Sequence, residues 1–228
     1  MLHGYGSSLI EGTLLTLAVA LASLVIAAVL GLLGALAKLS HSRVLQVLAG
    51  AYTTFIRAVP DLVVMLLVFY GGQMAINQLG ERLGWDYVDI NPFVAGVLTI
   101  GFVFGAYLTE ILRGAFLAVP PGQREAAVAF GMRPGQVLWR VVGPQMLRHA
   151  LPGFSNIWLV MIKSTAIVSV IGLSDLMSRA GQAAGATREP FVFYLAAAAV
   201  YLALTSASEL GFAWLLRRLA IGVRKVAL

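Results

Sequence analysis

Residues 120–135, PPGQREAAVAFGMRPG, separate two long apolar segments and are themselves only partly apolar. The leading prolines end the preceding helix, because proline lacks an amide donor and disfavours helix at the residue before it. Residues 123–130 then read as a short helix, and Gly131 suits its C-terminal cap. Pro134 and Gly135 break the chain again. A helix of two turns is not stable alone in water, so we predict that it docks on another surface.

Composition indicates a membrane protein. Of the 228 residues 60% are apolar and only 11% are charged, with a mean hydropathy of +0.89. A soluble domain of this size carries about 25% charged residues. The absence of cysteine excludes disulfides, thiolate metal sites and thiol catalysis. The N-terminus lacks the features of a cleaved signal peptide, so we expect it to be retained.

The expected fold is an all-α integral membrane protein that forms one domain over residues 1–228. Several apolar runs approach the roughly 20 residues that cross a bilayer. We predict five spans, at residues 12–37, 60–74, 92–117, 150–171 and 190–216. We expect residues 1–10 to form a short amphipathic segment before the first span, and residues 44–58 to supply part of the length with which the second span crosses the membrane. Polar loops are expected at residues 78–91 and 172–189.

Lysine and arginine are unevenly distributed between the two sides of these spans. The larger group is Lys38, Arg43, Arg57, Arg113, Arg124, Arg133, Arg140, Arg148, Arg217, Arg218, Arg224 and Lys225. The smaller group is Arg82, Arg179 and Arg188, while Lys163 lies within a span. Because basic residues mark the cytoplasmic side, we expect a periplasmic N-terminus and a cytoplasmic C-terminus, with residues 120–135 in the cytoplasm. The net charge of +6 therefore reflects topology, and we expect no nucleic-acid partner.

The motif in residues 125–144 resembles the EAA loop of ABC importer permeases, E-A-A-x3-G-x9-I-x-L-P. The matching residues are Glu125, Ala126, Ala127, Gly131 and Pro144, with Val141 for isoleucine and Gly143 where the pattern has leucine. In that family the loop is a cytoplasmic coupling helix that enters a cleft on the ATPase subunit. The resemblance implies that these residues and Arg124 contact an ATPase. The simpler alternative is a polar turn between two membrane helices.

The resemblance continues outside this loop. Residues 52–63, 105–116 and 189–191 are similar to polar amino-acid permeases, and the chain as a whole resembles the HisQ-type subunits of that family. This implies a type I ABC importer transmembrane domain in the bacterial inner membrane. It also implies import of histidine, arginine, lysine or ornithine, with opines or other polar amino acids as the alternative.

The same resemblance implies the partners of the chain. They are a homologous M-type permease subunit, a dimer of ATP-binding subunits and a periplasmic substrate-binding protein, within a lipid bilayer. ATP and Mg²⁺ would be bound by the ATPase, and no cofactor by this chain.

Ionisable side chains inside spans are costly, so each one requires a reason. Glu110 shares a helix face with Tyr107 and Arg113. We expect either a buried Glu110–Arg113 pair that fixes helix packing or a part in the substrate path. Asp61, directly after Pro60, is expected to have a structural role at the start of its helix.

Lys163 lies near the middle of the fourth span. It either has a structural role, by pairing with Glu110 across the bundle or by extending its charge to the membrane interface, or meets the α-carboxylate of an amino acid, helped by the hydroxyls of Ser164, Thr165 and Ser169. Related permeases often carry Lys-Asp here, so Ser164 leaves any acidic contact with a cationic substrate to other positions. Glu11 is a candidate for that contact, and it could equally be an exposed acid at a helix start.

No catalytic motif or nucleotide-binding sequence is present, so we expect a non-catalytic subunit. The three histidines (His3, His41 and His149) are too scattered to form a metal site by spacing. The energy source must be another polypeptide or an ion gradient. A secondary carrier would show inverted internal repeats, and none is evident. A membrane-embedded enzyme would show a catalytic acid–base or metal-binding cluster, and the sequence shows none.

Overall fold

The computed structural model describes residues 3–219, and every regular element in that range is helical. The elements are α1 (Gly6–Leu39), α2 (Arg43–Ala58), α3 (Asp61–Leu66), η1 (Leu67–Gly71), α4 (Gly72–Leu83), α5 (Pro92–Leu117), α6 (Pro121–Ala129), α7 (Pro134–Val137), η2 (Leu138–Val142), α8 (Gly143–Ser164), η3 (Thr165–Ile171), α9 (Leu176–Thr187) and α10 (Pro190–Leu219). Among them are 5 stretches long and apolar enough to cross a membrane. The predicted all-α fold with five candidate spans is confirmed, and the bounds of the third span match α5.

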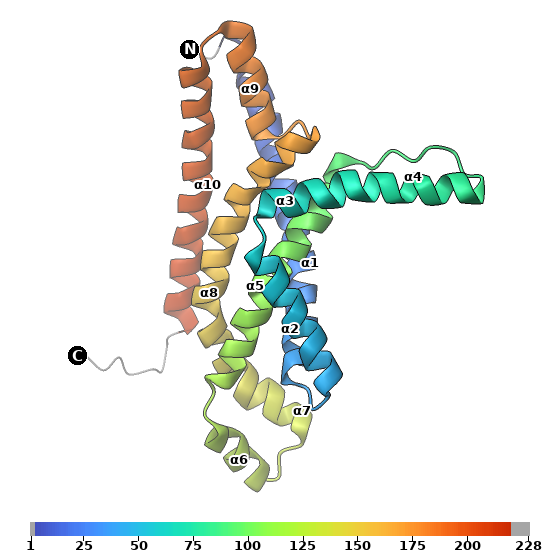
Figure 1. The fold of residues 1–228 in the computed structure, drawn as a ribbon. Coiled ribbons are helices and arrows are strands. Elements are labelled where there is room, and N and C mark those ends of the chain that lie inside the picture. Colours follow the sequence, from blue (N-terminus) through green and yellow to red (C-terminus); the bar gives the residue numbers. More distant parts are fainter. Residues whose placement is uncertain (1–2, 220–228) are drawn as a thin grey trace.

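The bundle is formed by α1, α5, α8 and α10, which run alongside one another (Figure 1). The start of α1 and helix α9 lie at one end of the bundle, whereas α6 and α7 lie at the other. Helix α2 returns beside α1 and α5. The second candidate span, Asp61–Leu83, then leaves the bundle sideways, and α4 extends away from the other helices.

Helices α1 and α5 approach so closely that glycine is required at their contact. A Cβ on Gly31 would lie 2.6 Å from the Cβ of Leu108, and a Cβ on Gly101 would lie 2.6 Å from the Cβ of Ile26. Small residues allow such approach between membrane helices, where dispersion contacts replace the hydrophobic effect as the source of attraction. Two further glycines take part in the same contact, Gly34 and Gly105. The pairing of α1 and α5 is therefore built into the sequence of both helices.

The predicted polar loop at residues 78–91 is partly wrong, because α4 continues to Leu83 and ends at Gly84 with φ 72°. Side-chain amides hold the returning chain against this helix. Asn77 donates to the carbonyl of Val88 and accepts from its amide, at 2.9 and 2.8 Å, and Gln73 accepts from the amide of Ile90 at 2.8 Å. These bonds satisfy backbone groups that would otherwise require water.

The predicted polar loop at residues 172–189 is also wrong, because most of it forms α9. Asp175 caps this helix by accepting a hydrogen bond of 2.9 Å from the amide of Ser178. The alanines at positions 180, 183 and 184 are buried and pack in one cluster with Phe193 of α10 and Leu9 of α1. Their spacing of three and four residues was the signal for a helix face.

The other predicted boundaries shift outward. Helix α1 begins at Gly6, so part of the amphipathic segment predicted at residues 1–10 belongs to the helix of the first span. The fourth span is continuous with its helical approach, from Pro134 to Ile171, and contains one π-helical and one 3-10 segment. Helix α10 extends to Leu219. Arg224 and Lys225, which were counted as cytoplasmic, lie outside the described residues.

We expect Gly101→Val to disrupt the bundle, because the new side chain would overlap Ile26 and cost about 1–3 kcal/mol. The matched control is Gly114→Val on the same helix, where an added Cβ meets nothing within 4 Å. Thermal unfolding of the purified protein in nanodiscs measures both. Equal unfolding midpoints for the two variants would contradict the close α1–α5 contact.

Asp175 is an unusual buried acid directly before α9. It is 1% exposed, and its Oδ2 has no hydrogen-bond partner within the described chain. Burial raises the pKa of Asp175 from 3.8 to about 6, and hydrogen bonds from backbone amides, that of Ser178 among them, offset part of the rise. The folded protein thus binds this proton more tightly than the unfolded chain. The stabilisation is complete below about pH 4 and is lost as the pH rises through 6.

We therefore expect Asp175→Asn to raise the unfolding midpoint at pH 7.5 by about 3 °C, since asparagine keeps the helix cap and removes the buried charge. The difference from wild type should shrink as the pH falls below 6. Thermal unfolding between pH 4.5 and 7.5 measures it, with Asp86→Asn in the exposed 84–91 segment as control. A difference that does not vary with pH would contradict the buried-acid account.

Candidate functional site

The loop between α5 and α8 forms a compact helical turn at one end of the bundle. Helix α6 occupies Pro121–Ala129, close to the predicted range, and Gly131 follows with φ 77°. The amide of Gly131 donates to the carbonyl of Val128 at 2.9 Å, and the amide of Met132 donates to that of Ala127 at 3.1 Å. This pair of bonds is a Schellman cap, which requires a left-handed residue at the position of Gly131. The predicted C-terminal cap is present.

The α6 helix docks on the start of the next span through one alanine. Ala127 is buried in a small apolar cluster with Val119, Val137 and Val142. Glu125 and Ala126 face outward and are exposed. The two alanines of the motif therefore have different environments, one inside the loop and one on its outer surface.

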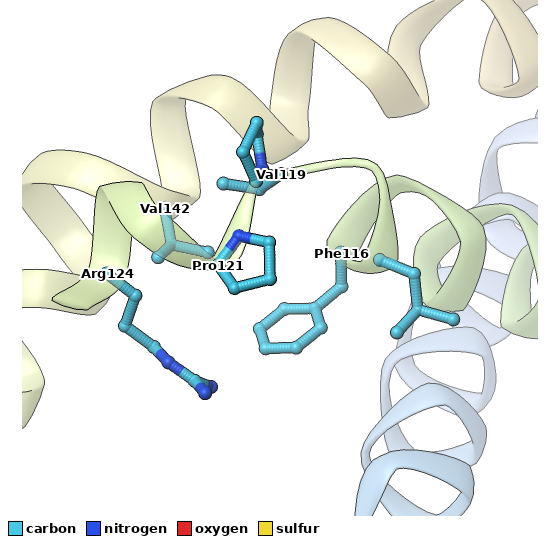
Figure 2. A pocket seen from close by; sticks show the side chains of 7 residues that line it. Phe116, Val119, Pro121, Arg124 and Val142 are labelled. Atoms are coloured by element: carbon cyan, nitrogen blue, oxygen red, sulfur yellow. The ribbon is translucent and has the colours of Figure 1, made fainter.

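Two adjoining hollows open beside this helix, with volumes of about 150 and 320 Å³. Both are lined by Phe116, Arg124 and Val142. Figure 2 shows the ring of Phe116 and the side chain of Arg124 extending toward the same open side of the smaller hollow. The end of α5 and the start of α6 thus present an apolar recess with one guanidinium at its rim.

Large apolar side chains are exposed on α6, on the residue that follows it and on η2. Phe130 is 90% exposed and Trp139 is 80% exposed, and neighbouring Val128 and Leu138 are also exposed. Exposed aromatic groups on one surface are typical of a contact with another protein. The sequence analysis did not single out Phe130 or Trp139, although their aromatic character within a polar loop was a usable signal.

The tail of the motif adopts a π-helical turn. Gly143 begins α8 directly after η2 (Leu138–Val142), and Pro144 is the second residue of α8. A Cβ on Gly143 would lie 2.8 Å from the carbonyl oxygen of Leu138. The glycine that stands where the family pattern has leucine is therefore required by the extra residue in this turn.

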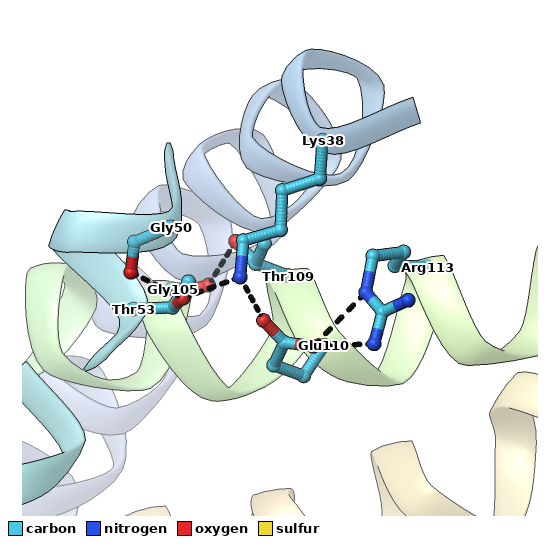
Figure 3. A network of polar contacts seen from close by, with 7 residues as sticks. All are labelled: Lys38, Gly50, Thr53, Gly105, Thr109, Glu110 and Arg113. Carbon is cyan, nitrogen blue, oxygen red and sulfur yellow. Dashed lines mark hydrogen bonds and ion pairs between the residues drawn. The ribbon is translucent and has the colours of Figure 1, made fainter. Parts of the chain in front are cut away.

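Glu110 lies in a polar network near the end of the bundle that carries α6. Lys38 of α1 donates to Glu110 Oε1 and, at 2.6 Å, to the hydroxyl of Thr53 in α2. Arg113 Nη2 lies 3.0 Å from Glu110 Oε2 (Figure 3). The Glu110 carboxylate thus joins one cation from α1 and one from α5, and Lys38 extends the network to α2.

The predicted pairing of Lys163 with Glu110 is wrong. Lys38 takes that place because α1 and α5 are in direct contact, whereas the Lys163 side chain is exposed and forms no ion pair within residues 3–219. The hydroxyls of Thr165 and Ser169 donate to carbonyls of their own helix, Ile162 and Ala166, at 2.6 and 2.7 Å. The hydroxyl hydrogens of both are thereby used within the helix, and Ser164 lines a small cavity with Asp61.

The other two residues predicted for the substrate path, Glu11 and Tyr107, also contact side chains of the chain itself. Glu11 accepts a hydrogen bond of 2.8 Å from Arg179 of α9, at the opposite end of the bundle from α6. The ring of Tyr107 lies under the guanidinium of Arg57, 5.4 Å from the ring centroid. The structure therefore separates Glu11 from the Glu110 network and gives Tyr107 a cation–π contact.

Sequence reasoning named Asp61 and Ser164 separately, but it missed Thr99 and the proximity of these three residues. Asp61 lines a cavity of about 10 Å³ together with Thr99 of α5 and Ser164 of α8. The three positions are far apart in the chain, so no local pattern links them. Within the described residues no cluster of His, Asp or Glu is arranged to hold a metal ion.

Residues 27–221 match the family described as binding-protein-dependent transport system inner membrane component. The chain is 47% identical to the histidine/lysine/arginine/ornithine transport system permease protein HisQ of Escherichia coli (strain K12), over 100% of both chains. It is 43% identical to the octopine transport system permease protein OccQ of Rhizobium meliloti, over 97% of this chain and 94% of the other.

Solved structures agree with these relatives. The crystal structure of an amino acid ABC transporter with histidines matches with a TM-score of 0.80 and 33% identity, over 94% of this chain and 95% of the other. A structure of the inward-facing MetNI methionine ABC transporter matches with a TM-score of 0.72 at 16% identity, covering 94% and 97%, and shows a shared fold.

These matches confirm the expectation of a non-catalytic permease subunit, and they imply a complex with an ATPase and a binding protein. They give no support to an ion-gradient carrier or a membrane-embedded enzyme. The chain belongs to the family of inner membrane components of binding-protein-dependent transport systems, the multi-pass permease subunits of ABC transporters.

Proposed function

We propose that this chain is a permease subunit of an ATP-driven importer of the basic amino acids histidine, arginine, lysine and ornithine. The full-length similarity to the HisQ permease protein carries this proposal. The apolar bundle supplies the membrane path, and the recess beside α6 supplies a surface for a driving subunit.

The proposed assembly contains one copy of this chain, a homologous M-type permease subunit, two ATP-binding subunits and a periplasmic binding protein. ATP and Mg²⁺ bind to the ATPase subunits. The N-terminus lies in the periplasm, and α6 and the C-terminus lie on the cytoplasmic side. The start of α1 and α6 lie at opposite ends of the bundle, which supports placing them on opposite sides of the membrane.

We further propose that α6 transmits the motion of the ATPase to the bundle, with Arg124, Glu125, Ala126, Ala127, Gly131 and Pro144 as the coupling residues. Because Ala127 packs on Val137 and Val142, a displacement of α6 moves the start of the fourth span with it. The short link from α5 to α6 carries the same displacement to the third span. A rigid-body movement of this kind switches a central path between outward and inward access.

The proposed substrate is tested by uptake into proteoliposomes that contain the whole complex, ATP and the binding protein. We expect ATP-dependent accumulation of labelled arginine, with competition by histidine, lysine and ornithine. Octopine and nopaline belong in the same panel, because the chain is 43–44% identical to permease proteins named for these opines. If the opines competed and the basic amino acids did not, opines would be the substrates and the proposal of basic amino acids would be wrong.

The proposed docking surface is tested by a pair of phenylalanine variants. Phe130→Ala removes a ring that is 90% exposed, so it should leave folding intact and weaken ATPase co-purification by about tenfold. Phe191→Ala removes a ring that is 77% exposed at the opposite end of the bundle and should have no effect. If Phe191→Ala lost the ATPase and Phe130→Ala kept it, the proposed docking surface beside α6 would be contradicted.

A further inference from the structure

A polar hollow opens beside the Glu110 network, at the end of the bundle that carries α6. It has a volume of about 330 Å³ and is lined by Lys38 of α1, by Gln46 and Gly50 of α2 and by Arg113 of α5. Small-molecule sites in proteins have volumes of roughly 300–1,000 Å³. The hollow shares no lining residue with the apolar recess beside α6, so the proposed coupling surface does not account for it.

The hollow carries an excess of positive charge. Lys38 and Arg113 supply two cations, and Glu110, which pairs with both, supplies one carboxylate (Figure 3). Arg43 adds to the excess, because it lies one helical turn before Gln46 on the same face of α2 and forms no ion pair within residues 3–219. Charges interact strongly where apolar surroundings lower the dielectric constant. An anion that enters the hollow is therefore attracted.

The side chains that line the hollow also keep unused hydrogen-bond donors. An ammonium has three N–H groups, and Lys38 uses two of them, on Glu110 and on the hydroxyl of Thr53. Arg113 directs Nε and Nη2 at Glu110, whereas its Nη1 forms no hydrogen bond within the described residues. Gln46 donates one N–H of its amide to a backbone carbonyl at 2.7 Å and keeps the other. Three helices thus offer donors to one anion.

Exposed apolar side chains flank this hollow on two helices. They are Leu32, Leu33 and Leu36 in the last turns of α1 and Val44, Val47 and Leu48 in the first turns of α2. Because α1 is a candidate membrane span, its exposed leucines are positioned to meet acyl chains. A ligand with an anionic head and apolar tails matches both parts of this surface, whereas a soluble anion matches the hollow alone.

We propose that this hollow binds the phosphate group of an anionic phospholipid, with Lys38, Gln46 and Arg113 as its hydrogen-bond donors. The phosphodiester carries one negative charge, so it balances the excess and accepts charge-assisted hydrogen bonds from the ammonium and guanidinium groups. Basic pockets between membrane helices on the cytoplasmic side are typical sites for anionic lipid headgroups. The assignment to the cytoplasmic leaflet rests on the proposed orientation.

The charge around the hollow favours a lipid without a cationic headgroup. Phosphatidylglycerol has an uncharged glycerol beside its phosphate, whereas phosphatidylcholine carries a cation that Arg43 repels. Because the donors come from α1, α2 and α5, the bound lipid joins these helices. It stabilises their junction by mass action, to an extent set by its concentration and affinity.

Gly50 allows a test that changes the volume of the hollow and leaves its charge unaltered. A Cβ on Gly50 would meet nothing within 4 Å, so Gly50→Leu fills the hollow without overlapping the chain. Leucine is also the better helix former, so the variant should fold. The control is Gly211→Leu on α10, where an added Cβ likewise meets nothing within 4 Å and which lies outside this hollow.

Native mass spectrometry of the assembled, delipidated transporter counts the lipids that bind during a titration. We expect wild type to bind phosphatidylglycerol at least about tenfold more tightly than phosphatidylcholine. Gly50→Leu should abolish this tight binding, Gly211→Leu should keep it, and Arg113→Gln should weaken it by about fivefold. Because Arg113 also pairs with Glu110, Gly50→Leu is the decisive variant. Glycerol phosphate, which has the headgroup charge without acyl chains, should not displace the lipid.

Equal affinities of wild type for the two lipids would overturn the proposal, and so would unchanged tight binding by Gly50→Leu. An equal loss in Gly211→Leu would also contradict it, because the loss would not come from the hollow. Displacement by glycerol phosphate would identify a soluble anion as the ligand. Loss of the ATPase subunits from Gly50→Leu with unchanged lipid binding would identify a protein contact, and either result refutes the lipid site. These measurements involve no transported substrate, so their failure is distinguishable from failure of the proposed function.

Discussion

The close contact of α1 with α5 is the constraint on which the rest of the structure depends. Glycines on both helices, such as Gly31 and Gly101, bring the two backbones together where larger side chains would overlap. This contact places Lys38 beside Glu110, and it fixes α5, which carries Thr99 in the bundle and Phe116 at the recess. A rigid α5 is thus the common support for the polar network around Glu110, the small cavity beside Asp61 and the proposed docking surface.

Glu110 and Asp61, two acids within the candidate spans, have different surroundings. Glu110 is surrounded by cations from its own helix and from α1, so its charge stabilises the packing of three helices and is satisfied without a ligand. Asp61 lacks such partners within residues 3–219 and faces unpartnered hydroxyl groups.

The α6 loop combines internal rigidity with an apolar outer surface. Its Schellman cap at Gly131 and the burial of Ala127 fix its shape relative to the next span, while Phe130 and Trp139 face outward. A loop that changed shape under load would absorb the motion of a partner. One that is capped and docked passes this motion to the helices at both of its ends, which is the property that coupling requires.

The sequence by itself determined the five apolar spans, the bounds of α5 and the short helix before Gly131, because hydropathy, proline and glycine act over a few neighbouring residues. The tertiary structure decided that Lys38 rather than Lys163 pairs with Glu110 and that Asp61 shares a cavity with Thr99. These outcomes depend on contacts between residues distant in the chain. Such contacts have no local signature, since they are set by which helices can approach most closely.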